Sequence, residues 1–202
     1  MSINYYEENA NQFIEDTFYA DMSATYALFT KYLKSGATIL DIGCGSGRDS
    51  NYFLSQGYDV YAHDGSEAMT SHTKKFLGDK VVVAKFSEFE PFQLFGKNIM
   101  FDGLWACASL IHVSEEDLVN VVNKYTRHLN CEGVFFLSFK LRSENHEKDG
   151  RHFTNFTREK LKTFVADCGG LEIVESLETN DVRAGREDEG WISVVVKKRS
   201  EE

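Results

Sequence analysis

The sequence predicts an α/β fold built on a doubly wound, mostly parallel sheet, and three observations indicate it. Gly36, Gly57 and Gly78 each end an amphipathic segment and precede an apolar run, at equal intervals of 21 residues. This spacing is typical of units in which a helix ends at glycine and the next parallel strand begins. A loop with three alternate glycines, over 43–47, directly follows the first apolar run. Apolar runs of strand length then alternate with helical segments, which predicts seven strands in all.

Two helices are expected before the first strand. Residues 4–20 carry Tyr6 and Phe13 on one face, and a second helix starts near residues 21–23 and ends before Gly36. In a doubly wound fold this segment would lie across the ligand site. Tyr5 or Tyr6 is therefore a candidate for contact with the cofactor, with plain packing as the alternative.

The stretch 39–49 is the centre of the chain. Ile39, Leu40 and Ile42 are apolar and β-favouring, which predicts a buried strand, and the glycines that follow let a ligand approach the backbone closely. The pattern then becomes helical, with Tyr52, Phe53 and Leu54 expected to be buried. A strand, a glycine loop and a helix in this order hold a nucleotide-like ligand at the carboxyl end of a parallel sheet.

The glycine loop does not match the common phosphate-binding patterns. The dinucleotide fingerprint G-x-G-x-x-G would need a third glycine at position 48, where this chain has Arg48, and the Walker pattern is absent. Instead, Asp41 lies two residues before Gly43, which gives D-x-G-x-G-x-G. A tight glycine turn in some other α/β protein is the alternative interpretation.

The D-x-G-x-G-x-G pattern resembles motif I of the class I S-adenosylmethionine (SAM)-dependent methyltransferases. The resemblance implies a Rossmann-like sheet with an antiparallel last strand, N-terminal helices over the cofactor site, and SAM as cofactor. It implies one domain over 1–202, with 1–36 as cap helices and 37–202 as the core. It also implies that a carboxylate such as Asp41 lies near the ammonium and sulfonium of SAM. The short chain is similar to the small-molecule methyltransferases, including those labelled tellurite-resistance proteins.

A second acidic residue ends the next expected strand, over 58–64. Asp64 lies 17 residues beyond the glycine loop, where a doubly wound fold places a carboxylate for the ribose hydroxyls. An ordinary Asp-Gly turn is the alternative. Gly65 and Ser66 are expected to begin a helix that places Met69 against the adenine.

The third strand is expected over 80–84, with Phe86 and Ser87 along the adenine edge. Many members of the family have an acid just past this strand, but here the first acid is Glu88. A backbone group of Phe86 or Ser87 is the expected substitute for that contact. Residues 91–98 are expected to form a loop.

The fourth strand, over 101–106, leads into the region that the resemblance places under the methyl group. Ala106 and Cys107 are expected to line the cofactor pocket. His112, just past this strand, is the best candidate for a general base. A histidine packed structurally between its two apolar neighbours is the alternative.

The last third of the chain continues the alternation. Residues 142–156 are polar and lack periodicity, which predicts a mobile loop over the active site. The other expected elements are a helix capped by Ser114, a turn at 132–133, a strand over 134–140, a helix capped by Thr157, and strands over 171–177 and 191–196.

Basic residues gather in the segments expected near the acceptor, where they can recognise an anionic group. Solvated loops paired with their own acids are the alternative. The residues are Lys140, Arg142, Arg151, His152, Arg183 and Arg186.

Composition narrows the function classes. The net charge of −10 argues against a DNA or RNA partner and mildly favours a neutral or cationic acceptor, unless a local basic pocket overrides it. No apolar run approaches the ~20 residues that span a bilayer, and the start of the chain lacks a secretory signal. Four scattered cysteines without metal-ligand spacing predict reduced thiols, a cytoplasmic location and no metal site. A monomer or a homodimer is expected.

The predicted function is transfer of a methyl group from SAM to a small molecule. The alternatives are a non-catalytic SAM-binding or partner-binding protein, a NAD(P)-dependent oxidoreductase disfavoured by Arg48, and a methyltransferase of a macromolecule. His112 is the predicted catalytic residue. The predicted cofactor-binding residues are Asp41, Gly43, Cys44, Gly45, Gly47, Arg48, Asp64, Gly65, Ser66, Met69, Phe86, Ser87, Ala106 and Cys107.

Overall fold

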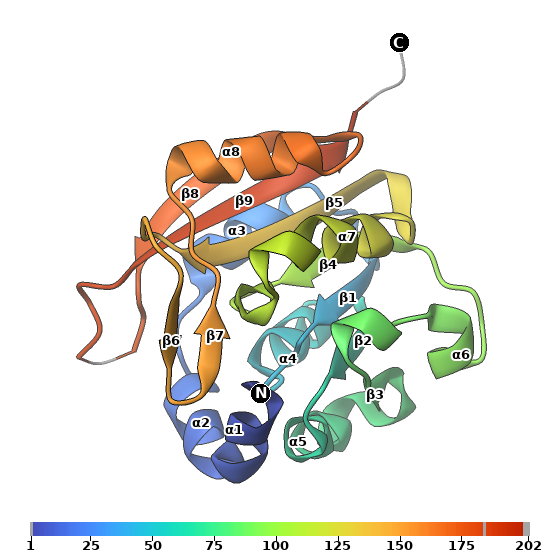
Figure 1. Cartoon of the computed structure of the whole chain (residues 1–202). Helices are drawn as coiled ribbons and strands as arrows, with labels where there is room; N and C mark the ends of the chain where they lie inside the picture. Colours follow the sequence, from blue (N-terminus) through green and yellow to red (C-terminus); the bar gives the residue numbers. More distant parts are fainter. Residues whose placement is uncertain (1, 184, 200–202) are drawn as a thin grey trace.

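The computed structural model describes residues 2–183 and 185–199. Its main sheet has seven strands, as predicted (Figure 1). They are β1 (Thr38–Ile42), β2 (Asp59–Asp64), β3 (Val81–Val83), β4 (Phe101–Ala106), β5 (Leu129–Lys140), β8 (Leu171–Asn180) and β9 (Gly190–Lys198).

The strand order is β3-β2-β1-β4-β5-β9-β8. The pairs from β3 to β5 are parallel, and β9 runs antiparallel to both of its neighbours. The predicted doubly wound sheet with an antiparallel last strand is therefore confirmed. Its order reverses at β1 and β4, and ligands of such sheets bind at the carboxyl ends of the strands beside that point.

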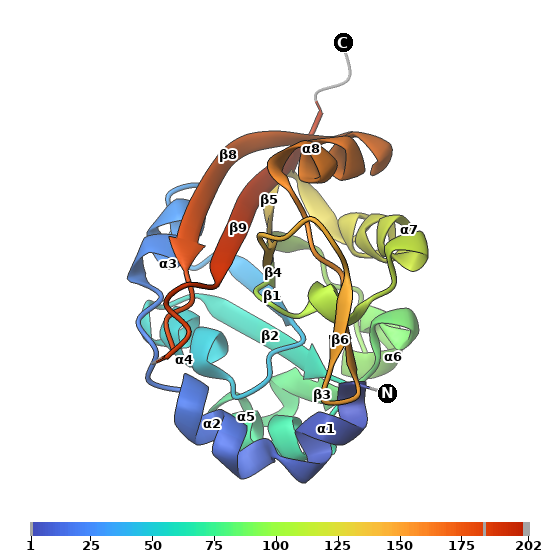
Figure 2. The same ribbon diagram turned by 60° about the vertical axis from the view of Figure 1, so that its left-hand side comes forward.

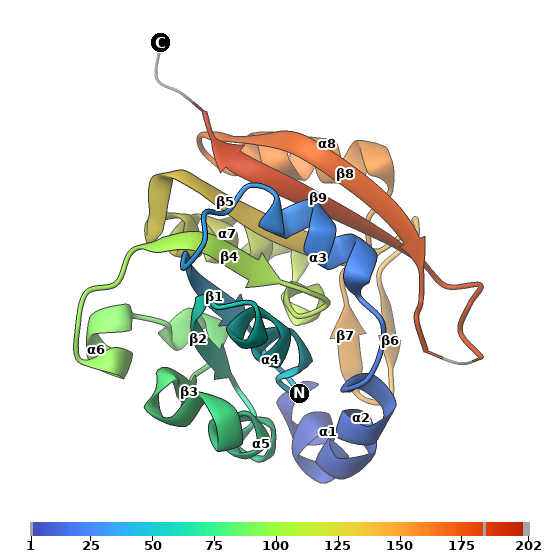
Figure 3. The ribbon, with the colours of Figure 1, turned by 180° about the vertical axis from the view of Figure 1, so that it is seen from behind.

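Helices cover both faces of the sheet (Figures 2 and 3). One face carries α3 (Ser23–Thr30) and α4 (Arg48–Ser55), and α5 (Glu67–Leu77) packs against β2 and β3. The other face carries α7 (Glu115–Thr126) and α8 (Arg158–Asp167). The cap consists of α1 (Ser2–Glu8) and α2 (Ala10–Thr17).

The alternation of side chains along β1 explains the two-sided packing. Ile39 joins the apolar cluster that contains side chains of α3 and α4, whereas Leu40 and Ile42 join the cluster of α7 and α8. Both faces of β1 are thus buried, as the apolar run predicts for a central parallel strand. This burial fixes where β1 ends, and so where the glycine loop begins.

Four local predictions were wrong. The expected helix over 4–20 is interrupted at Asn9, and 91–98 contains a short helix, α6 (Pro91–Phe95), which proline can begin because it needs no N–H donor there. The expected turn at 132–133 lies inside β5, opposite a register shift between Phe101 and Gly103. Leu54 is 38% exposed, because it is rotated about 100° from the buried Phe53 on α4.

Residues 142–156 form an ordered hairpin rather than the predicted irregular loop. Its strands are β6 (His146–Lys148) and β7 (Arg151–Phe153). Asp149 and Gly150 both have positive φ, 53° and 69°, which is the geometry of a two-residue hairpin turn. The Asp-Gly dipeptide was the available sequence signal. The hairpin extends from the sheet to α1, which contacts β7 (Figure 1).

Within residues 2–183 and 185–199, no helix combines the length and the apolar character that crossing a membrane requires.

Candidate active site

A cavity of about 230 Å³ lies at the carboxyl edge of the sheet. Its walls include the glycine loop, the ends of β2 and β5, the segment after β4, the α1–α2 cap, the β6–β7 hairpin and the segment that joins β8 to β9. Helices α1 and α2 therefore lie beside the glycine loop, where the N-terminal helices were predicted. The hairpin also lies over the site, where the mobile loop was expected.

The glycine loop is held in a conformation that other residues could not adopt easily. Gly43 and Gly47 have φ of +68° and +76°. A Cβ on Gly43 would lie 2.6 Å from Cβ of Ser109, and one on Gly47 would lie 2.5 Å from Oγ1 of Thr73. The backbone N–H groups of Gly43 and Cys44 donate to the carbonyl of His63, at 2.9 and 3.0 Å. The loop is therefore a fixed part of the cavity wall.

Asp64 ties the end of β2 to that loop. Its carboxylate accepts hydrogen bonds from the backbone N–H of Gly45 and of Ser66, both at 2.9 Å. Burial raises the pKa of Asp64, although these N–H donors oppose the shift. The side chain lines the cavity, so it can also accept from a ligand hydroxyl.

Asp49 is a buried hydrogen-bonding centre under the loop, and the sequence analysis missed it. Its carboxylate accepts from the Tyr26 hydroxyl at 2.6 Å and from Nε1 of Trp105 at 2.8 Å. Arg48 contacts the same carboxylate with Nε and one terminal nitrogen, at 2.6 and 3.0 Å. Burial alone would raise the pKa of Asp49, but the Arg48 charge and these hydrogen bonds hold it below its ordinary value.

Asp41 does not take the place that the resemblance implies for it. It is 2% exposed, lies outside the cavity wall, and accepts a hydrogen bond from Oγ of Ser50 at 2.6 Å. Burial, with the nearby Asp49 charge, raises its pKa well above the ordinary value. Asp49, eight residues later, is the acid that lines the cavity at this end.

Tyr6 and His112 face each other across the cavity wall. The Tyr6 hydroxyl lies 2.8 Å from Nε2 of His112, and Nδ1 of His112 lies 2.7 Å from the carbonyl oxygen of His152. Because a carbonyl only accepts, Nδ1 carries the hydrogen and Nε2 accepts from the Tyr6 hydroxyl. Burial lowers the pKa of His112 to about 4, so its imidazole is neutral at pH 7.

The cap is bonded to the core on both sides of the glycine loop. Oγ1 of Thr17 donates to Oγ of Ser46 at 3.1 Å. The Glu7 carboxylate accepts from the first backbone N–H groups of α5, which a helix N-terminus leaves free. The cap is thus part of the site's structure rather than an appended segment.

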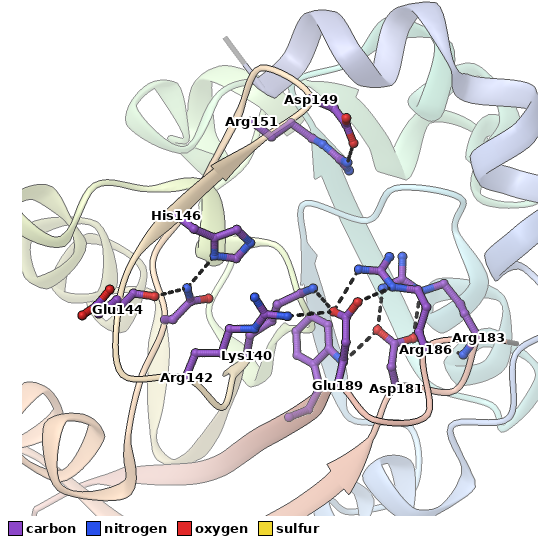
Figure 4. A network of polar contacts seen from close by, with 12 residues as sticks. Lys140, Arg142, Glu144, His146, Asp149, Arg151, Asp181, Arg183, Arg186 and Glu189 are labelled. Carbon is purple, nitrogen blue, oxygen red and sulfur yellow. Dashed lines mark hydrogen bonds and ion pairs between the residues drawn. The ribbon is translucent and has the colours of Figure 1, made fainter.

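The basic residues that were predicted near the acceptor are paired with acids, except His152, as the alternative interpretation expected. Arg183 pairs with Asp181, Arg151 with Asp149, and Glu189 lies between Lys140 and Arg142 on one side and Arg186 on the other (Figure 4). The predicted residues that line the cavity are Lys140, Arg151, Arg183 and Arg186, whereas Arg142 and His152 do not.

Most of the predicted cofactor-binding residues line the cavity. The predicted residues in the cavity wall are Gly43, Cys44, Gly45, Arg48, Asp64, Gly65, Phe86, Cys107 and His112. Those outside it are Asp41, Gly47, Ser66, Met69, Ser87 and Ala106. Met69 is fully buried, because it lies on the core face of α5, and Ser66 caps that helix by accepting from the backbone N–H of Met69. In the described part of the chain, no group of three or more His, Cys, Asp or Glu side chains is arranged to hold a metal.

Known proteins resemble this chain in its central part. Residues 39–133 match the methyltransferase domain family. An uncharacterized methyltransferase of Geobacillus sp. (strain WCH70) is 29% identical over 126 residues, which cover 61% of this chain. The match spans 57% of that relative, little more than half its length.

Solved structures resemble the whole fold. The 1,6-didemethyltoxoflavin-N1-methyltransferase of Burkholderia thailandensis, with 1,6-didemethyltoxoflavin and S-adenosylhomocysteine (SAH) bound, has a TM-score of 0.78 at 21% identity, over 98% of this chain and 86% of that one. A TehB-like SAM-dependent methyltransferase of Corynebacterium glutamicum ATCC 13032 has a TM-score of 0.67 at 21% identity, over 97% and 100%. At these identities the likeness establishes the fold.

The glycine loop, the strand order of the sheet and the family match all indicate the same class of protein. The D-x-G-x-G-x-G loop follows the first strand of a sheet with the order that this family has, and the family match begins at that strand. The match does not favour the oxidoreductase alternative, which Arg48 already disfavoured. Residues 39–133 thus resemble the methyltransferase domain family, and the sheet of the whole chain has the Rossmann-like fold of solved S-adenosylmethionine-dependent methyltransferases.

Proposed function

We propose that this chain transfers the methyl group of SAM to a small-molecule acceptor. The observation that carries the proposal is the continuity of the cavity. Its wall contains both the glycine loop with Asp64 and the Tyr6–His112 pair. A cofactor and an acceptor would therefore share one cavity; the structure of the Burkholderia enzyme holds both SAH and 1,6-didemethyltoxoflavin.

The residues of the cofactor end fit SAM. Oγ of Ser109 is buried beside Gly43 and has no hydrogen-bond partner among the described residues, as expected of a hydroxyl that meets a ligand's polar group. In the proposal Asp64 holds the ribose hydroxyls, Phe86 packs on the adenine, and Asp49 faces the positively charged methionine part. When bound, SAM supplies a methyl group activated by its sulfonium.

The acceptor is proposed to lie against Tyr6 and His112. Nε2 of His112 is already occupied by the Tyr6 hydroxyl, so Tyr6 is the group that can accept a hydrogen bond from an acceptor. A proton would pass from the acceptor to the Tyr6 oxygen while the Tyr6 proton passes to Nε2 of His112. With a pKa of about 4, His112 is a weak base, so this route suits an acidic acceptor, and an acceptor that is bound already ionised does not need it.

The chain is proposed to act as one domain with residues 1–36 as its cap, as a monomer or homodimer. The cytoplasm is the proposed compartment, because its four cysteines are free thiols. The tellurite-resistance-like subgroup stays a prediction.

Methyl transfer can be tested before the acceptor is known. The protein is incubated with SAM carrying a trideuterated methyl group and a pool of small metabolites, and mass spectrometry follows SAH and deuterated products. We expect SAH to accumulate together with a product that carries the label. Binding of SAH without any labelled product, across pools of all charge classes, would favour the non-catalytic alternative.

The Tyr6–His112 pair gives a sharper prediction once an acceptor is found. Tyr6→Phe and His112→Ala are each expected to lower kcat by about 10- to 100-fold, with SAH affinity unchanged, because they remove the hydrogen bond at the acceptor. The kcat of the unmodified protein should stay level from about pH 6 to 8, since a His112 pKa of about 4 leaves the imidazole neutral throughout. His128→Ala, remote from the cavity, is the control. An inflection of kcat near pH 6.5 that disappears in His112→Ala would contradict the buried, neutral histidine.

A further inference from the structure

The acceptor end of the cavity has an excess of positive charge. Its lining residues include five cations, Lys140, Lys148, Arg151, Arg183 and Arg186, and one acid, Asp181. The cofactor end is balanced, with Arg48 and Lys85 against Asp49 and Asp64. This local charge opposes the net charge of −10 of the whole chain. The sequence-based preference for a neutral or cationic acceptor therefore does not describe this pocket.

The acids behind the acceptor end cannot neutralise its cations. The Glu189 carboxylate is shared by Lys140, by Arg186 at 2.8 and 2.9 Å, and by Arg142 at 3.8 Å. One negative charge thus faces three positive ones. The pKa of Glu189 is lowered to about 2, mainly by the Arg186 hydrogen bonds, so it stays ionised at neutral pH. These pairs hold the cations in place and leave positive charge for a ligand (Figure 4).

Several donors in the cluster are free to bind a ligand. Arg183 and Arg186 each use Nε and one terminal nitrogen on an acid, so each keeps N–H donors on the other terminal nitrogen. Lys148 is exposed and has no ion-pair partner in the described part of the chain. Nε of Arg151 is buried and unpartnered among the described residues.

Aromatic side chains line the same end of the cavity. Lys140 is 3% exposed, and its Nζ lies 5.5 Å from the ring centre of Phe153 and 5.7 Å from that of Trp191. Both rings line the cavity, as does Tyr6. The Phe153 ring is covered by the stacked His146 and by the cations. A flat molecule would therefore pack against Trp191 and Tyr6 while its charged group reaches the cations.

We infer that the methyl acceptor is a planar organic anion, such as an aromatic carboxylate or phenolate, whose negative charge is bound by Lys140, Lys148, Arg183 and Arg186. The inference rests on the proposed function. It also explains how a site with a weak base can work. In the transfer, the S–CH₃ bond of the sulfonium breaks and a bond forms between the methyl carbon and the ionised acceptor atom. The sulfonium charge and the acceptor charge cancel, and no proton has to be removed.

The test compares three fragments of one shape and different charge on the protein saturated with SAH: benzoate, benzamide and benzamidinium. The two tryptophans give separate indole N–H signals in ¹H–¹⁵N spectra, assigned with Trp191→Phe. The Trp191 signal reports the acceptor end, and the Trp105 signal, bonded to Asp49, reports the cofactor end. We expect benzoate to shift the Trp191 signal and to bind about tenfold or more tightly than benzamide, with benzamidinium weakest.

Two further measurements identify the source of the preference. Lys148→Gln should weaken benzoate about threefold to tenfold and leave benzamide unchanged, whereas Lys162→Gln, an exposed lysine of α8 outside the cavity, should change neither. Raising NaCl from about 50 to 500 mM should weaken benzoate alone. SAH binding without a preference for benzoate, or with no fragment bound, would overturn the anion assignment and leave the cofactor assignment standing. Failure of SAH itself to bind would overturn both.

Discussion

Replacing Asp64 with alanine is expected to weaken SAH binding by about 10- to 100-fold. A hydrogen bond between a hydroxyl and a carboxylate contributes about 1.5–3 kcal/mol, and the proposed ribose contact consists of such bonds. The same change leaves the N–H of Gly45 and the N–H of Ser66 without an acceptor, so the loop loses its tie to β2 as well. Titration calorimetry with SAH measures the loss, and circular dichroism confirms that the variant is folded.

The control for Asp64 lies at the other end of the same strand. Asp59 begins β2, faces solvent in part and pairs with Lys80, far from the cavity lining. Asp59→Ala should bind SAH as the unmodified protein does. Asp64→Asn keeps an acceptor oxygen but loses the charge, and an intermediate affinity is expected. An unchanged affinity in Asp64→Ala would remove the ribose assignment.

Asp49→Ala is expected to cause the largest loss of stability of any single change at the site, about 3–5 kcal/mol in the free energy of unfolding. The substitution leaves the mostly buried Arg48 guanidinium without its partner and leaves the Tyr26 hydroxyl and the Trp105 N–H unpaired. Urea unfolding followed by tryptophan fluorescence measures the change. Asp79→Ala, an exposed acid, should change the unfolding free energy by less than about 0.5 kcal/mol.

The pH dependence of this contribution has a definite sign. The folded-state pKa of Asp49 lies below its ordinary value of 3.8, so the unfolded state binds the proton more readily. The stabilisation is therefore fully present above the ordinary value and is lost as the pH falls through the lower folded-state pKa. An Asp49→Ala protein as stable as the parent at pH 7 would show that the network does not support the loop.

The sheet could be predicted from the sequence because the residues that determine each of its elements lie close to that element in the chain. Apolar runs and helix caps lie within a few residues of what they determine, and the caps Ser66, Ser114 and Thr157 were found where expected. The glycine loop and Asp64 were recognisable for the same reason, because a fixed spacing links them to consecutive strands. The hairpin was missed, because its polar residues hid the Asp-Gly turn signal at 149–150.

The contacts that complete the site join distant parts of the chain. Tyr6 meets His112 across 106 residues, and Asp49 meets Trp105 across 56, so no local pattern marks either pair. Asp41 is buried outside the cavity wall, whereas Asp49, for which the sequence suggested no role, lies in it. The charge of the acceptor end also escaped prediction, since a net charge of −10 says nothing of where the cations gather.

The central claim is that the cavity at the glycine loop binds SAM. Titration calorimetry of the purified protein, shown to be free of carried-over cofactor, with SAM, SAH and NADH tests it most directly. We expect SAM and SAH to bind with dissociation constants in the micromolar range, about −8 kcal/mol, and NADH not to bind. A folded protein that binds neither sulfur nucleotide would contradict the account, and the methyltransferase function would have to be abandoned for this chain.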